Sequence, residues 1–341
     1  MDPQKKVPAV RVSAPVVWLA VLVWLLLLSA AQCQANGRDD SRPTPELPTP
    51  GLVLIPPIEP GDGSDLIDRL LERGIIRVGI RVWPEAEFSP PAFRGFSNAA
   101  TGGALNGFEV DIARAVAANL GLELELIEAY PPVIASGDWR GEWDIALASL
   151  VPFDRPPEAE TARSLVYSRP YGYIPMGILV PAGNDELDSF AQLSGQRVGL
   201  LEHSAYQRLL TEEADRLTIA GKPLLGEDTP DLQPVTVSNL QKSIRQLGQA
   251  EADIEPKLDA IFGPTPLLEE AVRSELPVRL ATNASNVGVQ PLVIAAVSQD
   301  DLKVERLILE INLILDRLQR RGELAEIYLD WYGRDLSQPL Q

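Results

Sequence analysis

The chain has 341 residues, 45% of them hydrophobic, which is an ordinary composition for a globular protein long enough to fold as two lobes. Its formal net charge of −18 would repel a phosphate backbone, so we expect no nucleic-acid partner. A single histidine and a single cysteine allow no intrachain disulfide and no Cys/His metal cluster, and no glycine-rich phosphate loop is apparent, so the sequence indicates neither a metal nor a cofactor.

The first 33 residues have the pattern of a secretory signal. Three basic residues within the first eleven positions precede an apolar run over residues 16–28, and small residues follow at 29–31. The run is short for a membrane-spanning helix, and an uncleaved signal anchor is the alternative. We therefore expect an extracytoplasmic protein, either periplasmic or at the cell surface.

Cys33 lies where such a signal would be cut. Its surroundings resemble the lipobox of bacterial lipoproteins, in which a lipid-modified cysteine becomes the new N-terminus. The match is incomplete, because Ala30 and Gln32 stand where a leucine and a small residue are usual. The alternative is ordinary cleavage after Ala31 or Ala35 with an unmodified cysteine.

Residues 34–64 contain proline at short intervals and almost no apolar periodicity, which predicts a semi-extended linker. A lipid on Cys33, or an uncleaved signal anchor, followed by such a linker would tether a folded body to a membrane.

The folded part is predicted to begin at residue 65, where helices and strands alternate. This alternation is typical of a mostly parallel sheet covered by helices, and the absence of a short repeat excludes a solenoid. Apolar spacing and helix-ending glycines place the elements as follows: helices over 66–73, 108–120, 204–217, 301–321 and 323–332, and strands over 75–82, 122–127, 144–150, 197–201 and 258–262.

Several phrases of the sequence occur in an order typical of one protein family. They are IIRVGIRV at 75–82, GFEVDIARAVAANLGL at 107–122, WDIALASL at 143–150, VYSRPY at 166–171, LSGQRVGLL at 193–201, LDAIF at 258–262 and RRGELAEIYLDWYG at 320–333. Together they resemble the extracellular solute-binding proteins of family three, the receptors of polar amino-acid importers. The resemblance covers about residues 65 to 336.

The resemblance implies an α/β, periplasmic-binding-protein-like fold of two lobes joined by a two-crossing hinge. Lobe one would comprise residues 65–174 plus 289–341, and lobe two residues 175–288, with the crossings near 172–177 and 283–290. Short connections containing glycine suit a hinge.

The function that this resemblance implies is binding rather than catalysis. We expect the substrate-binding component of an ABC-type importer, a monomer that captures a small polar, carboxylate-bearing, amino-acid-like solute by lobe closure and delivers it to a membrane permease. The alternatives are an enzyme of the same fold, such as a dehydratase, and a ligand-sensing ectodomain.

Candidate ligand-binding residues follow from the rule that ligands lie at the carboxyl ends of strands in open α/β sheets. Trp83, Phe88 and Phe93 follow the first strand, and Phe93 is nearest to the family's PPF phrase, although Ala92 is an extra residue. Tyr130 follows the second strand and could reach the same region. Core or loop packing is the alternative for each aromatic.

In the loop after the strand at 144–150, the family has hydroxyl residues and then an arginine that grips the ligand carboxylate. Ser149 and Arg155 occupy the nearest positions here, and Arg163 is a rival for the arginine role. A surface ion pair is the alternative for both arginines.

In lobe two, His203, Ser204 and Ala205 fill the family's Gly-Thr-Thr turn, where backbone N–H groups receive a carboxylate. Ser204 is equally suited to be a helix N-cap, and His203 to be merely exposed.

The family's ammonium-pairing aspartate falls at Gly263 or Pro264, and Thr265 offers only a neutral hydrogen bond. Unless another carboxylate substitutes, a standard α-amino acid is disfavoured, because a buried unpaired ammonium is costly.

Overall fold

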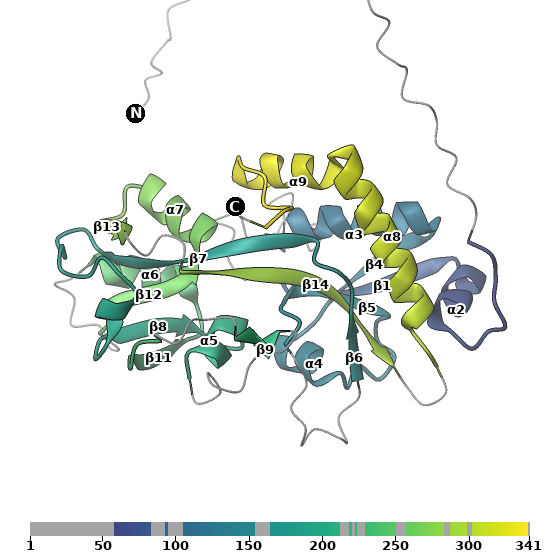
Figure 1. Ribbon diagram of the computed structural model, residues 1–341, viewed down its shortest axis with the longest axis horizontal. Helices are drawn as coiled ribbons and strands as arrows, with labels where there is room; N and C mark the ends of the chain where they lie inside the picture. Colours follow the sequence, from purple (N-terminus) through teal and green to yellow (C-terminus); the bar gives the residue numbers. More distant parts are fainter. Residues whose placement is uncertain are drawn as a thin grey trace, which may run out of the picture. The chain divides into compact units, whose positions relative to one another are not determined.

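The computed structural model describes residues 58–82, 93–94, 105–153, 164–211, 218–219, 222–223, 229–249, 257–282, 287–298 and 302–339 (Figure 1). The elements before the first crossing are α2 Leu66–Arg73, β1 Ile75–Ile80, β2 Phe93–Arg94, β3 Leu105–Asn106, α3 Phe108–Leu120, β4 Glu123–Glu128, α4 Pro131–Ser136, β5 Ile145–Leu150 and β6 Ser164–Tyr167. Those that follow are β7 Gly172–Pro181, a 3-10 turn Ala191–Leu193, β8 Arg197–Leu201, α5 Ala205–Leu209, β9 Thr218–Ile219, β10 Lys222–Pro223, β11 Gln233–Val237, α6 Leu240–Gly248, β12 Ala260–Pro264, α7 Thr265–Arg273, β13 Val278–Leu280, β14 Gly288–Ser298, α8 Glu305–Arg321 and α9 Glu323–Tyr332.

One sheet runs through most of these strands in the order β11-β8-β12-β7-β14-β5-β1-β4, with β13 paired to β7 and β6 paired to β14. The strands joined by helices pair in parallel, as the alternation predicts: β1 with β4 and β5, and β8 with β11 and β12. The two long strands β7 and β14 are antiparallel to their neighbours, so the sheet is mixed.

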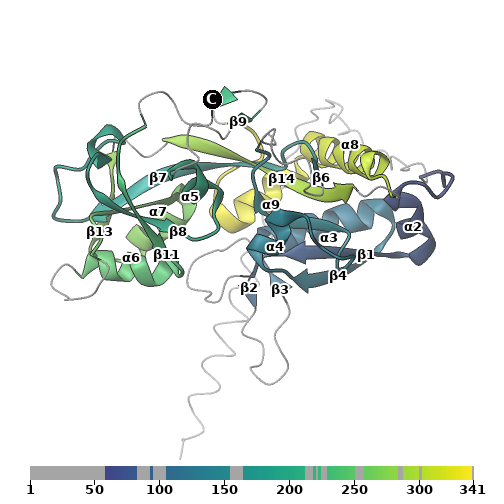
Figure 2. The same ribbon diagram turned by 90° about the horizontal axis from the view of Figure 1, so that it is seen from below.

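The two largest of the four hydrophobic clusters among the described residues form separate cores along this sheet. The first draws on residues between Leu66 and Ile174 and again from Leu292 to Leu336, and the second on residues from Met176 to Ala281. We call the parts built around them lobe one and lobe two. Figure 2 shows α2, α3 and α8 grouped with β1 and β4, and α5, α6 and α7 grouped with β8 and β11.

Both crossings between the cores are extended strands. β7 and β14 pair from Gly172 with Leu292 to Met176 with Gly288, and they run side by side between the two groups of elements (Figure 1). β12 joins β7 only from Met176 onward, and β5 joins β14 only from Val293 onward. In the recorded pairings, residues 172–175 and 289–292 therefore form a two-stranded ribbon.

The helix boundaries follow local signals in most places. α2, α3 and α8 end at Gly74, Gly121 and Gly322, whose φ angles of 73°, 72° and 78° are left-handed and favour glycine. The expected helix over 204–217 is wrong in its length, because α5 ends at Leu209, and residues 212–217 lie outside the described part of the chain. Within the described residues, every helix is too short or too polar to cross a lipid bilayer.

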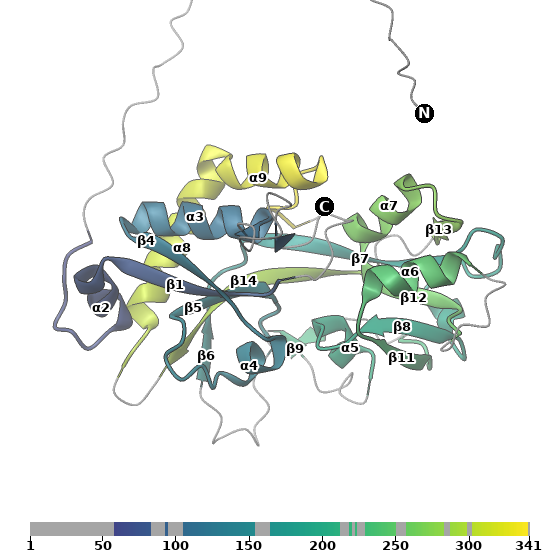
Figure 3. The same ribbon diagram turned by 180° about the vertical axis from the view of Figure 1, so that it is seen from behind.

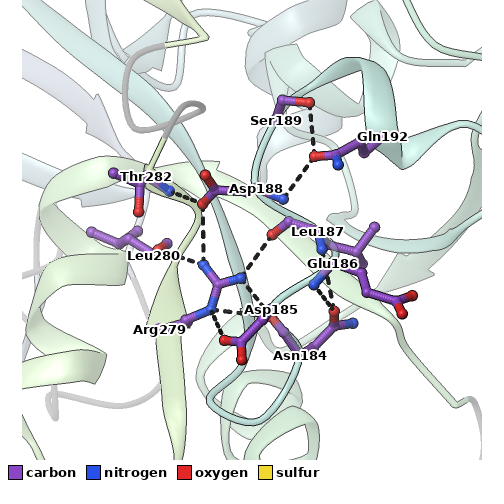
Figure 4. A network of polar contacts seen from close by, with 10 residues as sticks. All are labelled: Asn184, Asp185, Glu186, Leu187, Asp188, Ser189, Gln192, Arg279, Leu280 and Thr282. Atoms are coloured by element: carbon purple, nitrogen blue, oxygen red, sulfur yellow. Dashed lines mark hydrogen bonds and ion pairs between the residues drawn. The ribbon is translucent and has the colours of Figure 1, made fainter.

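One arginine holds the segment after β7 against β13 in lobe two. Arg279 of β13 donates hydrogen bonds to the carbonyl oxygens of Asn184, Leu187 and Leu280 and pairs with Asp188 at 3.3 Å (Figure 4). The planar guanidinium reaches all of these acceptors at once.

We predict that Arg279→Lys lowers the free energy of unfolding by about 1–2 kcal/mol, because a lysine ammonium cannot serve the three carbonyl groups together. Urea denaturation would measure the change. Arg273→Lys is the matched control, because Arg273 pairs with Glu270 on the surface, where its side chain is 59% exposed against 24% for Arg279. Equal losses in the two variants would contradict the prediction.

Candidate functional site

The two lobes contact each other through the residues that follow β4 and β8. The Tyr130 hydroxyl lies 3.2 Å from Nε2 of His203, and the two rings meet edge to face with centroids 5.6 Å apart. Tyr130 is nevertheless 61% exposed. Figure 3 shows α4 and α5, the helices that begin just after these residues, on the same side of β7 and β14. The structure thus brings two of the predicted site residues together.

A second contact joins the loop after β5 to α5. The guanidinium of Arg208 lies 5.5 Å from the centroid of the Phe153 ring, which is within the range of a cation–π interaction. Phe153 also packs against the core of lobe two. The carboxyl ends of β4 and β5 in lobe one therefore both reach the region around the β8–α5 turn.

Arg81, directly after β1, carries a positive charge into the same region. Burial lowers its pKa, and electrostatic interaction with Tyr206, Glu109 and Glu202 opposes that shift. Tyr206 and Glu202 belong to lobe two, whereas Glu109 belongs to lobe one. The sequence analysis missed Arg81, although the rule of strand ends that selected the other candidates applies to it as well.

The β8–α5 turn is fixed by its own hydrogen bonds. Ser204 is the N-cap of α5, because its hydroxyl accepts from the Gln207 N–H at 3.0 Å and donates to the Leu201 carbonyl at 2.6 Å. His203 is exposed and has a left-handed φ of 58°, and its backbone N–H donates to Oε1 of Gln207. Ala205 is the first residue of the helix.

Ser149, near the end of β5, also has a left-handed φ, of 52°. Its N–H and hydroxyl both donate to Oε1 of Glu109, at 2.5 and 3.1 Å, and the Tyr171 hydroxyl donates to the same oxygen at 2.6 Å. Burial raises the pKa of Glu109, while the hydrogen bonds from Tyr171 and Ser149 and the charge of Arg81 oppose the rise. The sequence analysis noted Ser149 but not this partner.

The end of β12 lacks the family's ammonium-pairing aspartate, as the sequence indicates. Gly263 and Pro264 are strand residues paired with Gly177 and Met176, and Thr265 begins α7 with 2% of its surface exposed. A Cβ at Gly263 would lie 3.9 Å from the Tyr206 hydroxyl, so this strand end is near the same region. Positions 263–265 supply no carboxylate, and Glu202 is the lobe-two carboxylate that interacts with Arg81.

The remaining predicted residues are not placed. Trp83, Phe88, Arg155, Arg163 and Cys33 lie outside the described residues. Phe93 lies in β2, opposite Asn106 of β3, and only its backbone is described. Among the described residues, no group of three or more His, Cys, Asp or Glu side chains could hold a metal ion.

Comparison with known families gives one decisive match. The model of the bacterial extracellular solute-binding proteins, family 3, matches residues 81–334. The chain belongs to this family. The matched range includes the strand ends of both lobes.

Individual relatives and solved structures are distant but span nearly all of the folded part. The "Probable amino-acid ABC transporter-binding protein" of Haemophilus influenzae is 23% identical over 284 residues, which are 81% of this chain and 91% of that protein. The L-cystine-binding protein TcyJ of Escherichia coli is 22% identical over 275 residues, 80% of this chain and 88% of that protein. An ancestral arginine-binding protein bound to arginine has a TM-score of 0.55 and 23% identity, covering 76% of this chain and 99% of that one. This structure shares the fold.

The Tyr130–His203 contact can be tested through the single histidine, whose ring signals need no assignment. We predict that Tyr130→Phe changes the Nε2 chemical shift of His203 in an NMR spectrum, because it removes the hydroxyl at 3.2 Å. Tyr173→Phe, in β7, is the control and should leave the shift unchanged. An unchanged shift in Tyr130→Phe would mean that the contact does not form in solution.

Proposed function

We propose that this protein is the substrate-binding component of an ABC-type importer, which captures a small carboxylate-bearing, amino-acid-like solute between its two lobes. The observation that carries the proposal is the meeting of strand ends from the two lobes, where the Tyr130 hydroxyl lies 3.2 Å from Nε2 of His203. Burial lowers the pKa of Arg81 in lobe one, and the charge of Glu202 in lobe two opposes that shift. Family membership gives the solute-binding class. The relatives named for amino acids favour a solute of that chemistry.

Both signs of charge in this region suit a zwitterion. Arg81 is a bidentate donor able to hold a carboxylate, alone or together with an arginine from the loop after β5, either Arg155 or Arg163. Glu202 can take the ammonium-pairing role that Gly263, Pro264 and Thr265 do not fill. We therefore infer that an α-amino acid remains a suitable solute and that Glu202 replaces the expected aspartate.

The other predicted contacts complete this site. The first-turn amide groups of Ala205 and Tyr206 can receive a carboxylate, since residues at a helix start have no intrahelical acceptor. The side chains of Tyr130 and His203 would cover the solute from the two lobes. Trp83 and Phe93 are aromatic candidates for its apolar part.

Closure of the lobes is the proposed mechanism. A solute that contacts both lobes shifts an ensemble of open and closed forms towards the closed form, which a membrane permease would recognise. The ribbon of residues 172–175 and 289–292 is the proposed hinge, because these two paired stretches link the two cores. Binding without turnover is expected, and the protein is expected to act as a monomer.

The proposed location is outside the cytoplasm. It rests on the signal pattern of residues 1–33 and on the proline-rich linker at 34–64, with a lipid on Cys33 as the proposed tether. Mass spectrometry of the protein extracted from membranes would test the tether directly.

A thermal-shift screen of amino acids, carboxylates, opines and polyamines tests the proposed function. We predict that at least one zwitterionic amino acid raises the melting temperature, because a ligand at 100 times its Kd stabilises the folded state by about 2.7 kcal/mol. Turnover of a prephenate-like compound would instead indicate an enzyme. A screen in which no solute changes the melting temperature would contradict the proposal.

The roles of the two charges can be separated with the solute found in that screen. We predict that Arg81→Gln weakens its binding by about 10-fold or more, because a charged hydrogen bond to the carboxylate is lost. Glu202→Gln should weaken the binding of an amino acid but not the binding of its hydroxy-acid analogue, because the analogue has no ammonium group. Isothermal titration calorimetry would measure both.

The matched controls are Arg114→Gln and Glu142→Gln, whose charges lie on the exposed surface of lobe one. They should bind as the unaltered protein does. If Glu202→Gln weakened the binding of the amino acid and of the hydroxy acid equally, Glu202 would not be the residue that pairs with the ammonium group.

A further inference from the structure

Glu109 is a carboxylate with no exposed surface, placed at the second position of α3. Its Oε1 atom accepts three hydrogen bonds, from the Ser149 N–H, the Ser149 hydroxyl and the Tyr171 hydroxyl. Oε2 has no hydrogen-bond partner among the described residues. Such a group is costly to bury, and the neighbouring start of a helix and the charge of Arg81 only partly offset the cost. Packing alone therefore does not explain its presence.

The first group that Glu109 holds is strained. Ser149 has a φ of 52°, a conformation that costs a residue with a Cβ of the order of 1 kcal/mol and that persists only where the surroundings enforce it. The two hydrogen bonds to Oε1 come from this one residue and fix both its backbone and its side chain. The chain leaves β5 at this point for the loop that contains Phe153.

The second group lies at the start of the crossing strand. Tyr171 precedes Gly172, the first residue of β7, and its N–H donates to the Leu292 carbonyl of β14 at 2.8 Å. At Gly172 itself a Cβ would lie 1.7 Å from the Tyr328 hydroxyl, so α9 packs directly against this backbone. The Tyr171 hydroxyl therefore joins Glu109 to one end of the ribbon between the lobes.

We propose that Glu109 is a positioning residue for solute binding: its Oε1 holds Ser149 in the left-handed conformation that presents the end of β5 to the solute, and through Tyr171 it ties that strand end to the start of β7. This rests on the proposed function, in which the end of β5 contacts the solute. Glu109 acts through Ser149 and does not itself contact the solute.

In a positioning role, the place of the Glu109 Oε1 atom matters more than the charge of the carboxylate. Two conservative variants change these two properties separately. Glu109→Gln keeps an acceptor oxygen at the same distance from the backbone and loses the charge. Glu109→Asp keeps the charge and draws the oxygen back by one carbon, out of reach of the Ser149 N–H. A positioning role requires that Gln replaces Glu better than Asp does.

Hydrogen exchange of the ligand-free protein is the first measurement. We expect the Ser149 amide to exchange within about 3-fold of its normal rate in Glu109→Gln and about 10-fold faster in Glu109→Asp, since each 1.4 kcal/mol of lost protection is tenfold in rate. The opposite order of the two variants would show that charge is what matters and would overturn the proposal.

Ser149→Gly provides the background that isolates the mechanism, because glycine adopts a positive φ without strain. In that background the difference in solute affinity between Glu109→Gln and Glu109→Asp should shrink to less than about 3-fold, because a glycine at position 149 adopts the left-handed conformation without help from Glu109. An undiminished difference would mean that Glu109 acts by another route, and it would equally overturn the proposal.

The second measurement uses L-arginine and L-cystine as probes, chosen from the solutes of the related proteins. If either raises the melting temperature of the unaltered protein, Glu109→Asp should lose about 10-fold in affinity for it and Glu109→Gln should lose less than about 3-fold. Equal affinities in both variants would contradict a role in binding. If no solute of the wider screen binds, the proposed function fails, whereas the exchange experiment still decides whether Glu109 positions Ser149.

Discussion

The pairing of β7 with β14 is the constraint on which the rest of the structure depends. Over residues 172–175 and 289–292 these strands pair with each other, while each side of this stretch belongs to a different hydrophobic core. The ladder keeps the two crossings in register, so a movement of one lobe relative to the other must pass through both strands together. This stretch is also held from α9 and the C-terminal segment, because the Tyr173 N–H donates to the Leu336 carbonyl at 2.8 Å and the Tyr328 hydroxyl lies against Gly172.

The same topology brings polar and aromatic side chains from both lobes to one region. Parallel strands on each side of the ribbon direct their carboxyl ends towards the β8–α5 turn, where Tyr130 meets His203 and Arg208 covers Phe153. Arg81 adds a positive charge to this region, and Glu202 adds a negative one. The low exposure of Glu109 behind Ser149 means that part of the polar network supports the strand end from the interior.

Membership of the solute-binding family accounts for this arrangement. A binding protein needs opposed polar groups on two bodies that can approach each other, and a core in each body that keeps those groups in place. Side chains at strand ends and helix starts supply opposed polar groups, such as Tyr130 and His203, and each body has its own core.

The sequence by itself determined helices α2, α3, α8 and α9, strands β1, β4, β5, β8 and β12, and the glycine ends of α2, α3 and α8, because capping and apolar periodicity are local signals read within a few residues. The order of its phrases indicated the family. It also indicated Tyr130, Ser149 and the 203–205 turn, since each follows or ends a predicted strand. Only the tertiary structure decided that α5 stops at Leu209. It alone placed the charge of Glu202 within electrostatic reach of Arg81 and Glu109 beneath Ser149. Those pairs join residues from different elements, 40 positions apart for Glu109 and Ser149, and no pattern within one element specifies which side chains will meet across a fold.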